Sequence, residues 1–154
     1  MTSPRASAAA LRKAVAAAIP ELLALGDTSG VPRAPGKWSP REIIGHLVDS
    51  AINNYSRFVR GQLEESLVFP GYAQEEWVRV GGYQEAQLEE LVVLWQALNS
   101  RIAAVMETMP EQARSRLVTP GTGDGVSVEA SLTLEQLMSD YVAHLNHHLR
   151  QILS

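Results

Sequence analysis

Apolar side chains recur every three or four residues in four long stretches of the chain, the spacing that builds one apolar face on an α-helix. This pattern predicts helices over residues 5–25, about 40–63, 84–106 and from about residue 133 onward. Pro20 lies inside the first stretch and should either kink that helix or restart it. Four long helices joined by loops predict an all-α fold, and a four-helix bundle in particular.

Start signals support two of these helices. Ser39 is a good N-cap, Pro40 occupies the first helical position, and Glu42 completes a capping box three residues after the serine. Thr133 is likewise placed to cap the last helix. We therefore expect the second and the fourth helix to begin at these residues.

The segments between the helices carry turn-forming residues. Residues 26–37 are rich in Gly, Pro and Ser and should form a loop. Residues 69–83 are expected to form an irregular connector anchored by aromatic side chains. In LVTPGTGDGVSV, residues 117–128, Asp124-Gly125 lies between short β-branched runs, which favours a small hairpin before the last helix.

Composition narrows the class of protein. A chain of 154 residues is most simply one domain, residues 1–154. The 13 basic and 17 acidic residues give a net charge of −4 without a basic block, so nucleic acid and anionic membranes are poor candidate partners. Charged residues and proline interrupt the apolar N-terminal stretch, which argues against a membrane span or signal peptide and favours a cytoplasmic protein. The absence of cysteine excludes disulfides, cysteine metal ligands and a cysteine nucleophile.

Three of the 4 histidines crowd into the last helix, in the segment DYVAHLNHHLRQI. With residues placed about 100° apart around the helix, His148 falls within the apolar face and His144 on its border. His147 falls on the other side. His144 and His148 are one turn apart, so their ring nitrogens could each reach one metal ion at about 2.0–2.1 Å. Two histidines hold a metal poorly, so a third ligand has to come from elsewhere in the chain.

The third ligand has few candidates. Asp140 lies one turn before His144 but about 12 Å along the helix axis from His148, so it cannot easily serve both. The remaining histidine, His46, lies outside the main apolar stripe of its own helix. Its neighbours on the helical wheel are polar: Ser50, Asn53, Asn54 and Arg57. Such a polar line fits a solvated surface and equally fits a wet cleft between helices.

Several residues near His46 have both a structural and a functional interpretation. Asp49, three residues on, could accept a hydrogen bond from the His46 ring or be an exposed carboxylate. Arg57 could contact an anionic substrate or pair with Glu64 on the helix surface. The tryptophans are more typical of a core than of a cofactor site: Trp38, Trp77 and Trp95.

The segments GKWSPREIIGHLVDSAINNYSRFVRG and TLEQLMSDYVAHLNHHLRQI, with FPGYAQEEW between them, resemble the DinB-like superfamily of metal-binding four-helix proteins. The chain is most similar to the YfiT-like branch, which includes bacillithiol S-transferases. The resemblance covers most of the chain and implies that His46, His144 and His148 hold a divalent metal ion. Zinc or nickel fits three imidazoles best, and an open coordination position is typical of a catalytic site.

The resemblance implies a metal-dependent thiol S-transferase, in which a low-molecular-weight thiol bound to the metal as a thiolate attacks a small electrophile. Asn53, Asn54 and Arg57 are the candidates for contacting that cosubstrate, and Asp49, Arg57 and His147 are the candidates for a catalytic role. A metal-dependent hydrolase using metal-bound hydroxide is an alternative, with His147 or Asp49 as its base. A non-catalytic, metal-binding stress-response bundle is another. Family members are often dimers, so a homodimer is a further expectation.

Overall fold

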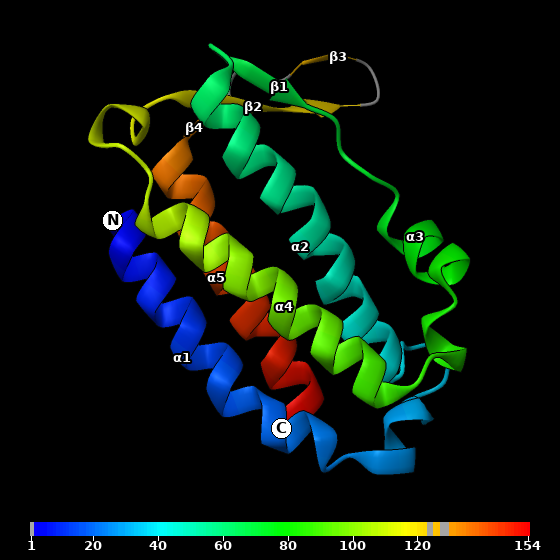
Figure 1. The fold of residues 1–154 in the computed structure, drawn as a ribbon. Helices are drawn as coiled ribbons and strands as arrows, with labels where there is room; N and C mark the ends of the chain where they lie inside the picture. Colours follow the sequence, from blue (N-terminus) through cyan, green and yellow to red (C-terminus); the bar gives the residue numbers. More distant parts are fainter. Residues whose placement is uncertain (1, 123–124, 127–129) are drawn as a thin grey trace.

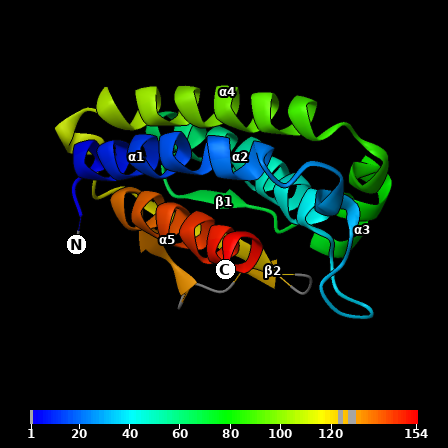
Figure 2. The ribbon, with the colours of Figure 1, turned by 90° about the horizontal axis from the view of Figure 1, so that it is seen from below.

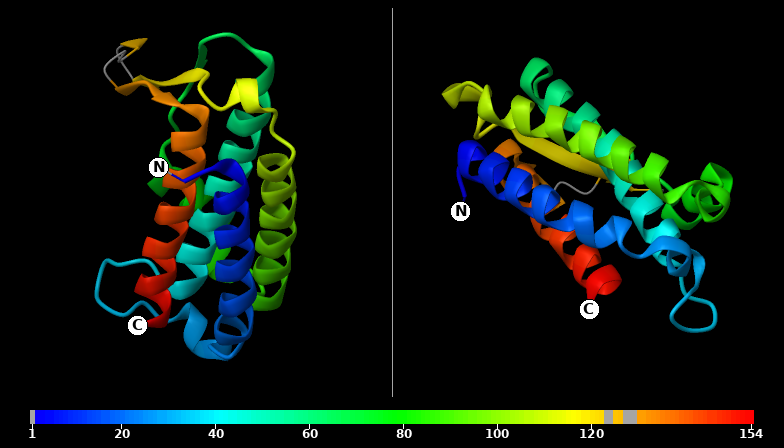
Figure 3. Two further views of the ribbon diagram at one scale, coloured as in Figure 1. Left: turned by 90° about the vertical axis from the view of Figure 1, so that its left-hand side faces the viewer. Right: turned by 60° about the horizontal axis from the view of Figure 1, so that its bottom comes forward.

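The computed structural model describes residues 2–122, 125–126 and 130–154, and its long helices form a four-helix bundle (Figure 1). These helices are α1 (Pro4–Leu23), α2 (Pro40–Leu63), α4 (Leu88–Glu107) and α5 (Leu134–Leu153). α1 packs against α4 and α5, and α2 packs against the same two helices. Figures 2 and 3 show the bundle from other directions. The predicted four-helix bundle is confirmed.

Apolar side chains fill the interior of the bundle. The largest fully buried ones come from all four helices: Leu11, Leu22, Ile44, Leu47, Phe58, Trp95, Ile102, Met106, Leu134, Met138, Leu145 and Ile152. Burying one such side chain contributes about 1.5–3 kcal/mol to stability. Between α2 and α5, the Phe58 ring meets the Tyr141 ring edge to face, with centroids 5.7 Å apart. This packing gives α2 and α5 a fixed relative position.

Capping boxes define where α2 and α5 begin. The Ser39 hydroxyl accepts a hydrogen bond from the backbone N–H of Glu42, whose carboxylate accepts one from the backbone N–H of Ser39. Thr133 and Gln136 make the same reciprocal pair at the start of α5. Both predicted starting points are confirmed, and they fix which residues of each helix face its partner.

Helix boundaries differ from the prediction elsewhere. α1 continues through Pro20 to Leu23, so the proline does not restart the helix. Residues Gly26–Gly30 of the predicted loop form a 3-10 helix, η1. α4 begins at Leu88 instead of residue 84 because Tyr83–Glu85 forms a separate 3-10 turn, η2, followed by extended backbone.

The connector predicted to be irregular, residues 69–83, contains a short helix, α3 (Gln74–Gly81). Acidic side chains in its first turn and Arg79 in its last complement the helix macrodipole. Gly82 ends the helix in the left-handed conformation, with φ of 67°, which glycine adopts without strain. The prediction was wrong here because the neighbouring glycines and aromatic residues obscured a helix of only 8 residues.

A small sheet lies at the end of the bundle where α2 ends and α5 begins (Figure 1). Its central strand β2 (Leu117–Thr122) pairs in parallel with β1 (Leu67–Phe69) and antiparallel with β3 (Gly125–Val126) and β4 (Leu132–Thr133). The β2–β3 pairing confirms the predicted hairpin, although Asp124 of its turn lies outside the described residues. Among the described helices, none is both long and apolar enough to cross a membrane.

Candidate metal centre between α2 and α5

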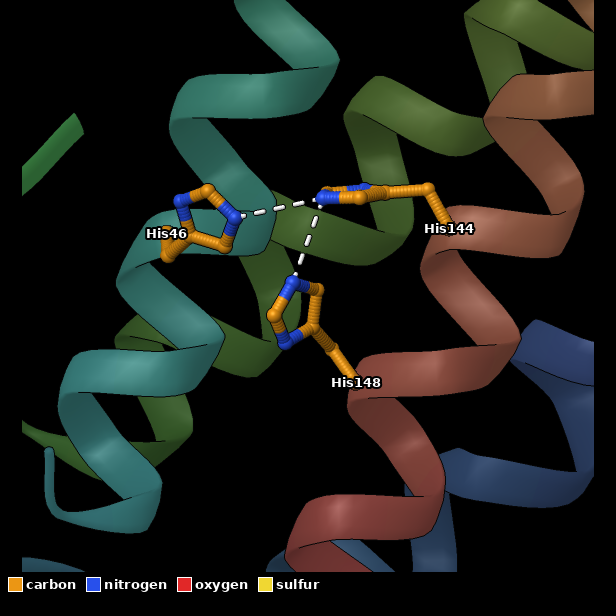
Figure 4. A group of neighbouring side chains, drawn as sticks. All are labelled: His46, His144 and His148. Carbon is orange, nitrogen blue, oxygen red and sulfur yellow. Dashed lines mark hydrogen bonds between the residues drawn. The ribbon is translucent and has the colours of Figure 1, made fainter. Parts of the chain in front are cut away.

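Three histidine side chains converge between α2 and α5, one from α2 and two from α5 (Figure 4). The Nε2 atoms of His46 and His144 are 3.4 Å apart, and those of His144 and His148 are 3.1 Å apart. One ring nitrogen from each of the three lies within 4.8 Å of the other two. The structure therefore brings together the same three residues that the resemblance implied.

This arrangement follows from the positions of the histidines on their helices. His144 and His148 are four residues apart on α5, so their rings leave the same side of the helix one turn apart. His46 is only 1% exposed, so the polar line on α2 is not a solvated surface where it begins. The other two histidines are half-buried, which leaves the group accessible from the α5 side.

The surroundings keep these imidazoles neutral at neutral pH. Burial, followed by the nearby His148 and His144, lowers the pKa of His46 to about 4. Burial, followed by His148 and His147, lowers the pKa of His144 to about 4. Burial also lowers the pKa of His148, against a smaller opposite effect of its hydrogen bond with Gln151. Neutral imidazoles present lone pairs, which is the form in which histidine binds a metal.

The nitrogen spacings fit a divalent ion. Three imidazoles around a tetrahedral ion at about 2.0–2.1 Å would place their nitrogens about 3.3–3.4 Å apart. Two of the three spacings, 3.4 and 3.1 Å, lie close to this value, and all three nitrogens lie within 4.8 Å of one another. Hydrogen bonds between the rings explain these two short contacts poorly, because both contacts use the same Nε2 atom of His144. Three neutral imidazoles are therefore a suitable donor set for a divalent metal ion.

Tyr83 and Gly45 shape the α2 side of this group. A Cβ atom at Gly45 would lie 2.0 Å from Cδ2 of Tyr83, so the tyrosine ring occupies the space that a larger residue would fill. The Tyr83 hydroxyl donates a hydrogen bond to Oδ1 of buried Asp49. Burial and this contact raise the pKa of Tyr83. Burial also raises the pKa of Asp49, against a smaller lowering by the hydrogen bond from Tyr83. Tyr83 thus joins the η2 turn to α2 on both sides of His46, because its ring packs on Gly45 and its hydroxyl bonds to Asp49.

Asp49 does not hold the His46 ring, contrary to the expectation from their spacing. Its Oδ1 is bonded to Tyr83, while its Oδ2 and the Nδ1 of His46 are both buried without a hydrogen-bond partner among the described residues. The aromatic neighbour of His46 is instead Trp38, whose ring centroid lies 5.1 Å away. The side chain of Asp49 has a better partner than the imidazole because Gly45 lets Tyr83 approach α2.

Two cavities flank the histidine group. One, of about 370 Å³, is lined by His148 together with Trp38, Arg33 and Lys37 of the loop before α2 and with Glu75 of α3. The Arg33 guanidinium donates to backbone carbonyls of Ile152 and Ser154, which holds this loop against the end of α5. The other cavity, of about 290 Å³, is lined by His144 and by polar side chains of both helices, including Ser50, Asn54, Arg57 and Asp140.

Only some of the other predicted site residues line the two flanking cavities. Arg57 and Asn54 line the cavity beside His144, whereas Asn53 bonds to the Asp49 carbonyl of its own helix and is not among the residues lining either flanking cavity. The alternative pairing of Arg57 with Glu64 was wrong, because Glu64 pairs with Arg60 at 2.7 Å. His147 is exposed and is not among the residues lining either flanking cavity, and its ring centroid lies 5.1 Å from that of His148.

Sequence reasoning missed several aromatic residues around the group. Trp95 lies in the core as predicted, but Trp38 lies against His46 and Trp77 is 38% exposed and packs on Tyr72. Tyr72 lines the His144 cavity, and burial raises its pKa. The available signal was the clustering of aromatic residues in the two segments that precede and follow α2.

Comparison with known proteins agrees with this geometry. The structure of YfiT from Bacillus subtilis, described as a probable metal-dependent hydrolase with an unusual four-helix bundle topology, superposes with a TM-score of 0.82 at 25% identity, covering 99% of this chain and 86% of that one. By sequence, the chain is 30% identical to the B. subtilis "Putative metal-dependent hydrolase YfiT" over 122 residues, 79% of this chain and 65% of that protein.

A "Putative metal-dependent hydrolase" of Geobacillus thermodenitrificans is 28% identical over 145 residues, covering 94% of this chain and 75% of that protein. The chain thus spans about two thirds of the length of the B. subtilis protein, 65% of it, and somewhat more of the Geobacillus one. The family model of the DinB superfamily matches residues 5–152, nearly the whole chain. The expected resemblance is confirmed, and the chain belongs to the DinB superfamily.

Proposed function

We propose that the protein is a metal-dependent transferase that joins a low-molecular-weight thiol to a small electrophile at the centre formed by His46, His144 and His148. The observation that carries this proposal is the pair of cavities that flank the histidines. His144 lines one cavity and His148 lines the other, so two reactants could approach the same centre from different sides. A hydrolase acting with water needs room for only one organic substrate.

Some residues of the chain bind the metal ion, and others exclude water from it. The histidines hold a divalent ion as neutral imidazoles, and Trp38 and Tyr83 shield the α2 side of the group. When bound, such an ion lowers the pKa of a thiol that coordinates it, which increases the thiolate fraction at neutral pH. Because the chain has 0 cysteines, the sulfur has to come from the cosubstrate.

The cavity beside His144 suits the thiol, because amide, hydroxyl and guanidinium groups of Asn54, Ser50 and Arg57 line it. The cavity beside His148 suits the electrophile, because the Trp38 and Ile43 side chains give it an apolar wall. Reactants held on two sides of one centre need no further diffusion before they meet, which is a large part of the catalytic advantage of a bisubstrate site.

Hydrolysis is the second candidate function, favoured by the names of the Bacillus and Geobacillus relatives. The two bases expected from the sequence have little support, since Asp49 is bonded to Tyr83 and His147 is exposed and lines neither cavity. Asp140 of α5 lines the His144 cavity and is a better placed carboxylate for activating water. Hydrolysis would proceed without any added thiol.

Metal content measured by mass spectrometry on untagged protein tests the centre itself. We expect about one zinc or nickel ion per chain, lost in His144→Ala and in His148→Ala, because each removes one of only three ligands. His147→Ala is the matched control, since it removes a neighbouring imidazole outside the group. Equal metal content in all four proteins would refute the assignment of the ligands.

Activity assays with the loaded protein separate the functions. Consumption of an alkylating electrophile that requires added thiol and disappears in His148→Ala supports transfer. Cleavage of nitrophenyl esters that is unchanged by thiol supports hydrolysis. A protein that holds metal and catalyses neither reaction contradicts both and leaves the non-catalytic bundle.

A further inference from the structure

Arg57 is an unusual cation for its position. Its guanidinium carbon lies 4.2 Å from the centroid of the Phe69 ring and 6.0 Å from that of Tyr72. It donates one hydrogen bond, to the carbonyl of Pro70 at 3.3 Å. No carboxylate lies within ion-pairing distance of it in the part of the chain that the structure describes. Burial between these groups lowers the pKa of Arg57.

A half-buried guanidinium with spare donors is a site for an anion. Arginine carries five N–H donors, and the structure assigns one of them to a partner among the described residues. Desolvation without a counterion costs free energy, which an arriving carboxylate or phosphate would recover through paired, charge-assisted hydrogen bonds. The aromatic rings of Phe69 and Tyr72 hold the guanidinium plane in place for such a contact.

The same cavity connects Arg57 to the histidine group, since His144 and Arg57 both line it. Arg57 lies about three helical turns beyond His46, a rise of about 16 Å along α2. Both side chains lean toward the N-terminus of the helix, and the longer arginine reaches back further than the histidine, which shortens this separation by a few Å. An anionic group on Arg57 would therefore lie on the order of 10 Å from the centre, about the extended length of a tripeptide.

We propose that Arg57 selects the cosubstrate, by binding a carboxylate placed on the order of 10 Å from the thiol that approaches the histidine centre. This inference rests on the proposed transfer of a thiol and adds the chemical class of that thiol. The selected class is an extended, anionic thiol of about tripeptide size. Small neutral thiols and short thiol acids cannot reach both ends of the cavity at once. Asp140, the acidic residue in the same lining, lies one turn from His144 and repels a carboxylate bound near the centre.

Calorimetric binding of matched thiols to the metal-loaded protein tests the proposal. Mercaptooctanoate separates its sulfur and carboxylate by about 10 Å, whereas mercaptopropionate separates them by about 4 Å. The amide of each acid serves as its neutral counterpart. We expect the long acid to bind about tenfold to a hundredfold more tightly than its amide, and the short acid to show no such preference.

Variants of Arg57 test whether this side chain causes the tighter binding of the long acid. Arg57→Gln should bind the long acid and its amide equally, and Arg57→Lys should retain part of the preference because it keeps the charge without the planar fork. Arg60→Gln is the matched control, since Arg60 lies on the same helix, is exposed and is paired with Glu64. Unchanged metal content and circular dichroism of the Arg57 variants would show that the fold is intact.

The outcomes distinguish this inference from the function on which it rests. Equal binding of acid and amide by the unaltered protein, or a preference that survives in Arg57→Gln, refutes the role of Arg57 and leaves thiol transfer standing. Failure of the loaded protein to bind any of the four thiols refutes thiol transfer and this inference together.

Discussion

The contact between Gly45 and Tyr83 leads to a prediction with an unexpected sign. Replacing a helical glycine by alanine normally stabilises a helix by about 0.5–1 kcal/mol, because glycine loses more conformational freedom on folding. At Gly45 the added Cβ would lie 2.0 Å from Cδ2, 2.1 Å from Cγ and 2.7 Å from Cβ of Tyr83. The tyrosine ring therefore has to leave its place in the Gly45→Ala variant.

The magnitude of the change in stability follows from two costs and one gain. Forcing a side chain out of a packed position costs about 1–3 kcal/mol. Asp49, which is 3% exposed, would lose the hydroxyl of Tyr83, and an unpaired buried polar group costs about 1–3 kcal/mol more. After subtracting the gain of about 1 kcal/mol in helix propensity, we expect a net loss of about 1–5 kcal/mol.

Urea unfolding of the metal-free protein, followed by circular dichroism, measures this difference. Ser56→Ala on the exposed side of α2 is the reference, and it should change stability by only a few tenths of a kcal/mol. In a Tyr83→Gly background all three conflicting atoms are gone, so Gly45→Ala should become stabilising. A Gly45→Ala variant as stable as the unaltered protein, or the same sign in both backgrounds, would refute the reasoning.

Three further changes have expected outcomes. Tyr83→Phe leaves the Asp49 carboxylate without its hydroxyl partner and should lower the free energy of unfolding by about 1–3 kcal/mol, measured with urea at pH 7. The pKa of His46 falls from about 6.5 unfolded to about 4 folded, so stability present above pH 6.5 should be lost as the pH falls toward 4. Between pH 7 and 5 the share of His46 amounts to about 2 kcal/mol in the metal-free protein, and His46→Gln should remove that share while the part due to His144, whose pKa is also lowered to about 4, remains. Arg60→Ala breaks an exposed ion pair and should leave the urea midpoint almost unchanged, with a still smaller effect in high salt.

Local signals in the sequence account for much of the fold. Ser39, Glu42 and Thr133 begin α2 and α5 where the capping rules place them, because a cap depends only on residues within one turn. β1 and β4 were not predicted, since strands of 3 and 2 residues form by pairing with β2 and carry no pattern of their own. The helix α3 was missed for a similar reason, because its 8 residues are too few for a clear period.

The candidate site shows the same division between local and distant information. The wheel of α5 was sufficient to place His144 and His148 together and His147 apart, because all three lie on one helix. The pattern along α2 could not show whether the polar side chains around His46 face solvent or line a cleft, since that depends on how α5 packs on α2. The partner of Asp49 was beyond reach because Tyr83 is 34 residues away and approaches only where Gly45 leaves room.

The spacing of the histidines along the chain has a consequence for the whole molecule. His46 and His144 are 98 positions apart, so an ion held by both would close a loop that contains α3, α4 and all four strands of the sheet. A cross-link over about 100 residues reduces the freedom of the unfolded chain by about 4–5 kcal/mol in the loop-entropy description of disulfides. The chain has 0 cysteines, so a bound ion would be a removable cross-link in a protein that cannot form disulfides. A chelator that removes the ion should therefore lower the free energy of unfolding as well as the activity.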